Sequence, residues 1–242
     1  MTTIYQNIIQ AKSKGERLLA VLLDPDKVNI NRLPIIVSKI EDSITTHIFV
    51  GGSTVNNGDT LPLVEAIKEL TNLPTILFPG DTSQITANAD AILWLSLISG
   101  RNPEYLIGKH VKSTSMVKAS NLEVIPTGYV LIESGKETAV EHVTQTKPLS
   151  VENVEFIVDT ALAGEFLGMK FIYLEAGSGA LRAVPSNVIK QVSQALNIPL
   201  IVGGGIRTME QIENAYDAGA DMVVIGTAFE ENSAFFEDLK KK

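Results

Sequence analysis

Residues 200–228 read LIVGGGIRTMEQIENAYDAGADMVVIGTA, and this stretch decides the fold. Its two apolar runs, residues 200–202 and 222–225, are short and largely β-branched, which is typical of strands buried on both faces of a parallel sheet. Each run ends in glycine, and a segment with plausible helical spacing lies between them. A strand, a glycine turn and a helix together form the repeating βα unit of an α/β fold.

The same pattern recurs toward the start of the chain. The further predicted strands are residues 18–23, 46–50, 75–78, 91–95, 123–131 and 171–174. Each predicted strand is followed by turn residues and by a plausible helix, such as the amphipathic series Val188, Ile189, Val192 and Leu196. Eight βα units in 242 residues match one (β/α)8 barrel. We therefore predict α/β class, a single (β/α)8 TIM barrel over residues 1–242, allowing for an irregular replacement of a helix by a loop on one side.

One connection differs from the others. Residues 132–150, IESGKETAVEHVTQTKPLS, are long, polar and without clear periodicity. Connections of this length in compact domains are usually functional or mobile. Because the segment follows the fifth strand, we expect it on the catalytic face of the barrel.

Composition excludes several classes of function. The net charge of −8 with scattered basic residues argues against nucleic-acid binding. The chain has no cysteine, so it has no disulfide, thiolate metal site or cysteine nucleophile, and we expect a cytoplasmic protein. The first twenty residues lack the pattern of a secretory signal, and no run approaches 18 consecutive apolar residues. We expect neither export nor a transmembrane segment.

Glycines follow the seventh and eighth predicted strands, at Gly203, Gly204, Gly205 and Gly226, the last followed by Thr227. One such turn is most often only a tight connection. Two at consecutive strand ends favour phosphate binding, because barrels often hold a phosphate after strands seven and eight and glycine lets backbone amides approach it. By themselves, the two turns predict only a phosphorylated ligand.

Acidic residues follow the sixth and first strands. Tyr173 and Glu175 are two residues apart, so both point toward the barrel axis, where Glu175 is a general base or, alternatively, a buried partner of a Lys or Arg. Asp24 could hold a hard cation such as Mg²⁺ or cap a helix, and the hydroxyl of Ser53 allows the same two interpretations. The three histidines show no metal-ligand spacing.

Five segments together resemble the geranylgeranylglyceryl phosphate synthase family. They are LDPDK at 23–27, VGGS at 50–53, YLEAGSG at 173–179, VGGGI at 202–206 and IGT at 225–227. YLEAGSG combined with DPDK is the most specific, whereas many phosphate-binding barrels share the glycine turns. The resemblance implies a Mg²⁺-dependent prenyltransferase of ether-lipid biosynthesis. Such an enzyme joins a polyprenyl diphosphate, most often geranylgeranyl diphosphate, to the 3-hydroxyl of sn-glycerol 1-phosphate and releases diphosphate.

The resemblance also implies roles for individual residues. Glu175 matches the base, and Asp24 and Ser53 match the metal positions. Tyr173 is the second predicted catalytic residue, which hydrogen-bonds the glycerol or turns its ring toward the developing cation. The implied substrate-binding residues are Tyr173, Leu174, Glu175, Ala176, Gly177, Ser178, Gly179, Gly204, Gly205, Gly226 and Thr227. Part of the family has a lysine at the position of Leu22, and Lys27 is a candidate replacement. We further expect a homo-oligomer, a dimer or a hexamer, with peripheral contact to a membrane.

Some features leave alternatives open. The prenyl groove is expected among residues that are equally compatible with core packing, namely Trp94, Leu95, Leu97, Ile98, Leu106 and Ile107. The donor could be longer, as in a heptaprenylglyceryl phosphate synthase. A phosphate-binding isomerase or cyclase would need a paired acid and base on strands one and five, yet strand five ends in Tyr129, Val130 and Leu131, with no carboxylate between this end and Glu133. A non-catalytic barrel that binds a phosphorylated metabolite or a partner protein is the third alternative.

Overall fold

The computed structural model describes residues 2–53, 60–226 and 235–240. Its strands form a closed barrel in sequence order, with β8 pairing to β1, and all neighbouring strands are parallel. The strands are β1 (Leu18–Leu23), β2 (His47–Val50), β3 (Thr75–Leu77), β4 (Ala91–Leu97), β5 (Glu123–Leu131), β6 (Phe171–Glu175), β7 (Leu200–Gly203) and β8 (Met222–Ile225). The predicted (β/α)8 barrel is confirmed, and β6 and β7 each extend one residue beyond their predicted ends.

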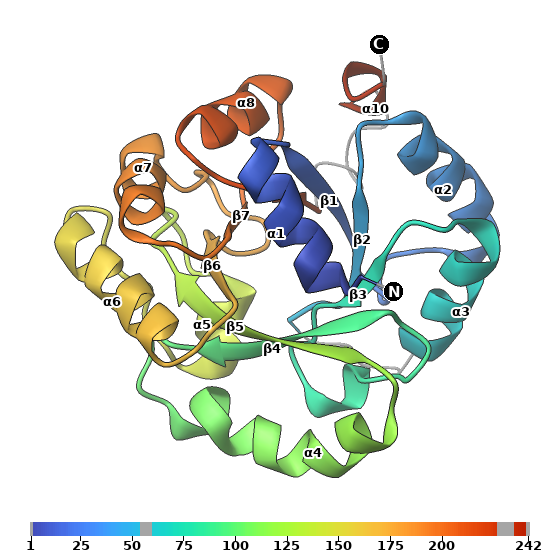
Figure 1. The fold of residues 1–242 in the computed structure, drawn as a ribbon, viewed down its shortest axis with the longest axis horizontal. Helices are drawn as coiled ribbons and strands as arrows, with labels where there is room; N and C mark the ends of the chain where they lie inside the picture. Colours follow the sequence, from blue (N-terminus) through green and yellow to red (C-terminus); the bar gives the residue numbers. More distant parts are fainter. Residues whose placement is uncertain (1, 54–59, 227–234, 241–242) are drawn as a thin grey trace.

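Helices surround the barrel (Figure 1). The longer ones are α1 (Ile4–Lys14), α2 (Leu33–Asp42), α3 (Thr60–Leu70), α4 (Lys109–Ala119), α6 (Val154–Phe166), α7 (Ser186–Ala195) and α8 (Met209–Asp217). The shorter ones are η1 (Ile30–Arg32), η2 (Thr82–Gln84), η3 (Glu104–Gly108), α5 (Ala139–Thr144) and α10 (Phe235–Asp238). The π-helical turn η3 leads directly into α4.

The connection between β3 and β4 has no α-helix. Residues 78–90 contain only the 3₁₀ turn η2, so the expectation of a helix after every strand is wrong here. Their sequence, FPGDTSQITANAD, is rich in turn-forming residues and lacks an amphipathic face that could pack on the barrel. The irregular replacement allowed for in the predicted fold lies at this position.

The long segment after β5 is partly helical. Thr138 caps α5 by accepting a hydrogen bond from the Glu141 amide, and Ile132 forms a bridge with Leu149 that returns the segment to the barrel. A helix of only six residues is too short to produce a visible hydrophobic period in the sequence. The side chains of Val140 and Val143 face the open end of the barrel, where they line a cavity.

The core has two layers, and β6 shows how they arise. Ile172 and Leu174 belong to the layer between the strands and the outer helices, whereas Phe171 and Tyr173 belong to the cluster inside the barrel. This is the two-residue alternation of a strand. The same alternation directs Glu175, the last residue of β6, toward the barrel mouth.

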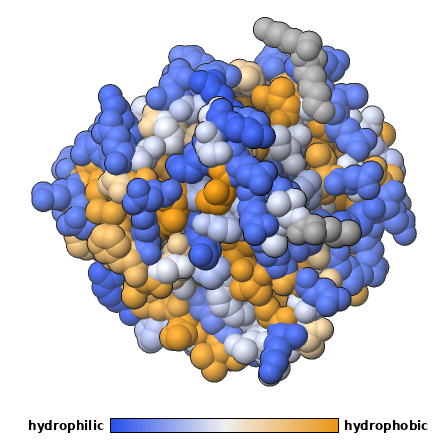
Figure 2. Space-filling view, in the orientation of Figure 1, coloured by the Kyte–Doolittle hydropathy of each residue, from blue (hydrophilic) through white to orange (hydrophobic). Residues whose placement is uncertain are grey.

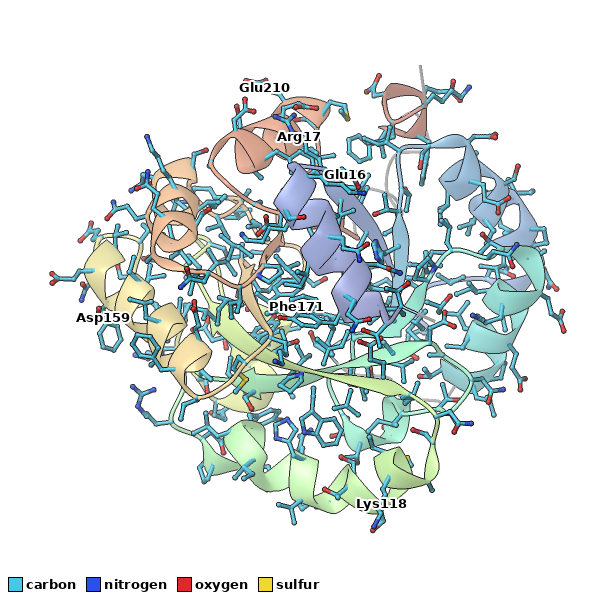
Figure 3. All side chains as sticks on the ribbon, viewed as in Figure 1. Glu16, Arg17, Lys118, Asp159, Phe171 and Glu210 are labelled. Carbon is cyan, nitrogen blue, oxygen red and sulfur yellow. The ribbon has the colours of Figure 1, made fainter. Side chains whose placement is uncertain are left out.

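Helix α1 closes the end of the barrel at which the strands begin. Figure 1 shows α1 crossing the barrel on the near face. The Glu123 carboxylate, at the start of β5, accepts hydrogen bonds from the amides of Ile4 (2.6 Å) and Tyr5 (3.1 Å). The Tyr5 ring packs on Phe171, and their ring centroids are 5.5 Å apart. Phe171 is labelled in Figure 3. A ligand site is therefore left to the opposite end, where the strands finish.

The surface is mixed in character. Figure 2 shows mainly hydrophilic residues over α1, and hydrophobic patches at the left and at the bottom, over α6 and α4. Exposed apolar side chains include Ile107 and Val111 near the start of α4, and Phe166 and Leu167 at the end of α6. Among the described residues, no helix combines the length and the apolar character needed to cross a membrane.

Candidate active site

A cavity of about 390 Å³ opens at the ends of the strands. Its polar part is lined by the loops after β1, β2, β6, β7 and β8, including Asp24, Ser53, Glu175, Gly204 and Gly226. Its apolar part extends between β4, η3, α4 and α5. The two glycine turns predicted to bind phosphate, the carboxylates of Asp24 and Glu175, and the hydroxyl of Ser53 thus line one cavity.

Glu175 is a buried carboxylate at the centre of the polar part. It ends β6, where it pairs in register with Gly203 of β7. Its Oε1 accepts a hydrogen bond of 2.6 Å from the Gly177 amide, and no described Lys or Arg forms a salt bridge with it. Burial raises the pKa of Glu175 to about 7, although the Gly177 amide and the nearby Tyr173 hydroxyl favour the charged form. A carboxylate with this pKa can accept a proton near neutral pH.

Two tyrosines lie beside this carboxylate. The rings of Tyr129 and Tyr173 stack with centroids 5.5 Å apart, and Phe78 stacks on Tyr173 at 5.2 Å. The Tyr173 hydroxyl is buried close enough to Glu175 to favour its charged form, but it makes no well-aligned hydrogen bond with a described residue. Burial, followed by the charge of Glu175, raises the pKa of both tyrosines well above the ordinary value, so both are neutral. A buried hydroxyl without a partner is suited to a polar ligand group.

The glycine turn after β7 packs directly on the end of β6. The φ angle of Gly204 is +80°, and a Cβ atom there would lie 2.1 Å from Oε1 of Glu175. Gly204 is therefore required both by its backbone conformation and by the close approach of the carboxylate. Gly205 and Gly226 line the same cavity. Thr227, which was also predicted to bind substrate, lies outside the described residues.

The segment 173–179 divides between two environments. Tyr173, Glu175, Gly177, Ser178 and Gly179 line the cavity. Leu174 and Ala176 are buried in the outer core layer, so their side chains point away from the cavity. Only their backbone could reach a ligand, and the Ala176 amide already donates to the Gly203 carbonyl. The predicted substrate contact of residues 174 and 176 would therefore have to come from the backbone, and it stays a prediction.

Asp24 and Ser53, the predicted metal ligands, both line the cavity. Asp24 accepts a hydrogen bond from the Asp26 amide and lies 3.4 Å from Nζ of Lys27, which places Lys27 at the rim. No cluster of three or more His, Cys, Asp or Glu side chains occurs in the described part of the chain. These donors fit Mg²⁺ that takes one carboxylate and completes its shell with ligand phosphates, because Mg²⁺ is often bound in this way.

The apolar part of the cavity corresponds only partly to the predicted groove. Trp94, Leu95 and Leu97 line it, and the Trp94 ring lies 4.8 Å from that of His110. Ile98 and Leu106 are not among its lining residues, and Ile107 is exposed to solvent. Residues of η3 and α5 complete the wall instead.

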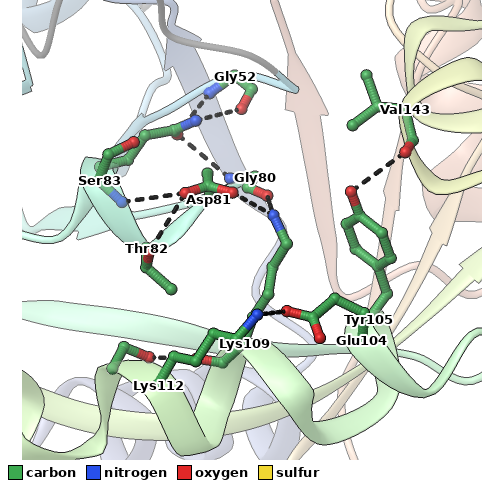
Figure 4. Close-up of polar contacts among 12 residues, drawn as sticks. Gly52, Gly80, Asp81, Thr82, Ser83, Glu104, Tyr105, Lys109, Lys112 and Val143 are labelled. Atoms are coloured by element: carbon green, nitrogen blue, oxygen red, sulfur yellow. Dashed lines mark hydrogen bonds and ion pairs between the residues drawn. The ribbon is translucent and has the colours of Figure 1, made fainter.

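Sequence analysis missed several residues of the cavity. Tyr129 could have been found, because it faces inward two residues before the end of β5. Asp81 and Lys109 also line the cavity but carry no local signal. The same holds for Gln84, which does not line the cavity but supports its wall. Buried Gln84 accepts hydrogen bonds from the amides of Gly52 and Gly80 and donates to the Gly52 carbonyl, so it joins the loops after β2 and β3 (Figure 4). Arg207 also lines the cavity and donates to the Ala180 carbonyl.

A parallel barrel whose mouth joins two glycine turns to a buried carboxylate defines a class: the phosphate-binding (β/α)8-barrel enzymes. Comparison with known proteins gives the family. The PcrB family matches residues 11–242. Two relatives, both named geranylgeranylglyceryl phosphate synthase, are from Flavobacterium johnsoniae (55% identical, covering 98% of each chain) and Pyrococcus furiosus (42% identical, covering 98% of this chain and 94% of the other). The chain belongs to the PcrB family.

Solved structures agree with this assignment. The (S)-3-O-geranylgeranylglyceryl phosphate synthase of Thermoplasma acidophilum, solved with its substrate sn-glycerol-1-phosphate, is 34% identical and superposes with a TM-score of 0.92, covering 99% of this chain and 96% of the other. The N-acetylmannosamine-6-phosphate 2-epimerase of Clostridium perfringens, at 15% identity and a TM-score of 0.58, shares the fold alone.

Proposed function

We propose that this protein joins a polyprenyl diphosphate, with geranylgeranyl diphosphate as the expected donor, to the 3-hydroxyl of sn-glycerol 1-phosphate. The observation that carries the proposal is the position of Glu175, a buried carboxylate with a pKa of about 7 between the glycine turns and the apolar part of the cavity. The names of the relatives, and the glycerol phosphate bound by the Thermoplasma acidophilum enzyme, support the same reaction.

The acceptor would bind at the glycine turns. Backbone amides at Gly204, Gly205 and Gly226 can face its phosphate, because no side chain covers them. The unpartnered hydroxyl of Tyr173 can bond to the glycerol. The 3-hydroxyl then lies beside Glu175, which takes its proton as the oxygen attacks the donor.

The donor would place its chain along the apolar part of the cavity and its diphosphate near Asp24. The bond between the allylic carbon and the diphosphate oxygen breaks, its electron pair leaves with the diphosphate, and the glycerol oxygen forms the new ether bond. Magnesium held by Asp24 and Ser53 would neutralise the diphosphate as it leaves. The stacked faces of Tyr129 and Tyr173 can stabilise positive charge on the allylic carbon.

The test is to incubate the protein with sn-glycerol 1-phosphate, Mg²⁺ and either geranylgeranyl or heptaprenyl diphosphate, and to search for ether products by mass spectrometry. We expect an ether product that depends on the acceptor, and competition between the two donors will identify the preferred chain length. The enantiomeric glycerol phosphate is the control for the acceptor site. Absence of product with every donor would contradict the proposal.

The isomerase alternative has less support. Such an enzyme needs a second acid or base after β5, but Glu133 is exposed and is not among the residues that line the cavity. We also propose self-association, which the exposed apolar residues Ile107, Val111, Phe166 and Leu167 support. The number of subunits, the cytoplasmic location and peripheral membrane contact stay predictions.

A further inference from the structure

Lys109 places an ammonium group on the wall of the cavity, and the function proposed above does not use it. It is the first residue of α4 and lines the cavity. Its Nζ donates to the Gly80 carbonyl at 3.2 Å, forms an ion pair with Asp81, and lies 4.7 Å from the centroid of the Tyr105 ring (Figure 4). The position of this ammonium on the cavity wall suggests that it contacts a ligand.

The ammonium lies where the polar and apolar parts of the cavity meet. Gly80, which accepts its hydrogen bond, packs so closely on the loop after β2 that a Cβ atom there would lie 2.4 Å from the Gly52 carbonyl oxygen. Gly52 in turn packs against the Asp24 carboxylate, 3.1 Å from the position a Cβ would take. On the other side of the Lys109 ammonium, Tyr105 belongs to the apolar wall of the cavity. The charged end of a prenyl donor would lie at this junction.

The ion pair with Asp81 can open at little cost. The Asp81 side chain is 46% exposed, and it also accepts hydrogen bonds from the Ser83 amide and the Thr82 hydroxyl, so it begins the η2 turn without help from Lys109. Burial alone would raise the pKa of Asp81, but the Lys109 hydrogen bond and these other donors lower it. Asp81 would stay ionised and solvated after Lys109 moved, so no unpaired charge would be buried.

We propose that Lys109 binds the diphosphate of the prenyl donor, exchanging the Asp81 carboxylate for phosphate oxygens while the Gly80 carbonyl holds its ammonium in place. The inference rests on the proposed function, because it assumes a donor whose diphosphate lies near Asp24. A lysine suits this role, since its ammonium is a compact charge with three donors. A diphosphate carries more charge than one carboxylate and would compete successfully for the ammonium.

The test measures binding of inorganic pyrophosphate with Mg²⁺ to the whole protein, in the wild type and in Lys109→Met. Trp94, the single tryptophan of the chain, lines the cavity beside His110 and provides a fluorescence signal, and calorimetry gives an independent value. Lys112→Met is the matched control: Lys112 is one turn along α4, is 66% exposed and pairs with Glu104, and it is not among the residues lining the cavity.

We expect Lys109→Met to weaken pyrophosphate binding about 10-fold to 100-fold, the range for losing one hydrogen bond to a charged group. Lys112→Met should bind as the wild type does. In the synthase assay, Lys109→Met should raise KM for the prenyl donor and leave KM for sn-glycerol 1-phosphate unchanged. A merely structural role would alter both KM values. Wild-type pyrophosphate affinity in a folded Lys109→Met protein would overturn the inference.

Asp81→Asn gives a second test if Lys109→Met does not fold. Removing the competing carboxylate charge should tighten pyrophosphate binding, and unchanged or weaker binding would overturn the inference. The outcomes also separate the two proposals. If the wild type forms no ether lipid but binds pyrophosphate through Lys109, the proposed function fails and the anion site remains. If ether lipid forms and Lys109→Met binds pyrophosphate normally, only the role of Lys109 fails.

Discussion

Two glutamates at opposite ends of the barrel show how differently one side chain can be used. Glu123, the first residue of β5, accepts hydrogen bonds from two backbone amides at the start of α1. Glu175, the last residue of β6, is buried with one amide donor, and its pKa is raised to about 7. The first carboxylate fastens a helix to the barrel, and the second is available for proton transfer.

The surroundings of the two glutamates differ in the same way. At the closed end, Lys12 of α1 pairs at 2.8 Å with Asp221, which directly precedes β8. Arg17, which directly precedes β1 and is labelled in Figure 3, pairs at 2.6 Å with Asp217 at the end of α8. At the open end, the Tyr173 hydroxyl is buried without a partner among the described residues. Polar groups are satisfied where they stabilise the fold, and they are left unsatisfied where a ligand is expected to complete them.

The largest predicted effect concerns turnover in Glu175→Gln. The amide cannot accept the proton of the glycerol hydroxyl, so kcat should fall about 10²-fold to 10⁴-fold, the usual contribution of a general base. Binding of sn-glycerol 1-phosphate, measured by calorimetry, should change little because the glycine turns are intact. In the wild type, kcat should rise with pH through about 7 as Glu175 loses its proton. Unchanged turnover would remove Glu175 from the role of base.

The same substitution should stabilise the protein at alkaline pH. The pKa of Glu175 is raised from 4.5 to about 7, so below pH 4.5 the carboxyl is neutral in both folded and unfolded chains. As pH rises from 4.5 to about 7, the unfolded chain ionises while the folded chain keeps its proton, so wild-type stability falls over this range and then stays constant. We expect Glu175→Gln to gain about 3 kcal/mol relative to the wild type between pH 4.5 and pH 8, since the shift from 4.5 to about 7 is about 2.5 pKa units and each unit corresponds to about 1.4 kcal/mol.

The measurement is urea unfolding at several pH values between 4.5 and 8.5. Glu210→Gln, an exposed position on α8, is the control and should show no pH-dependent gain. A constant difference between wild type and Glu175→Gln across this range would contradict the raised pKa. We therefore expect Glu175→Gln, at the open end of the barrel, to raise the free energy of unfolding and to lower turnover.

The sequence predicted those parts of the molecule that depend on local pattern. Strands buried on both faces are continuous apolar runs, and their period of two directs Tyr173 and Glu175 inward wherever the strand is placed. Glycines at successive strand ends had to meet, because neighbouring parallel strands finish at the same edge. The fold and the polar part of the site therefore followed from short-range information.

The remaining parts depend on contacts between distant residues. Lys109 and Asp81 are ordinary charged residues 28 positions apart, and the fold brings the start of α4 against the loop between β3 and β4. Gln84 joins the loop after β2 from 32 residues away. No spacing rule identifies such partners in one sequence. The outward side chains of Leu174 and Ala176, by contrast, follow from the alternation of β6 alone.

The smallest predicted effect concerns Glu123, at the closed end. Its substitution should lower stability and leave turnover unchanged, whereas substitution of Glu175 should raise stability and lower turnover. Glu123→Ala removes the acceptor for two amides of α1, so we expect a loss of about 1 to 2 kcal/mol in the free energy of unfolding, as for other lost helix caps. Asp159→Ala, an exposed carboxylate on α6, is the control and should lie within about 0.5 kcal/mol of wild type. At temperatures where Glu123→Ala is folded, its kcat should equal that of the wild type, because α1 and the cavity lie at opposite ends of the barrel. A lower kcat in folded Glu123→Ala would mean that the closed end also influences the active site. It would contradict the division of the barrel into a stabilising end and a catalytic end.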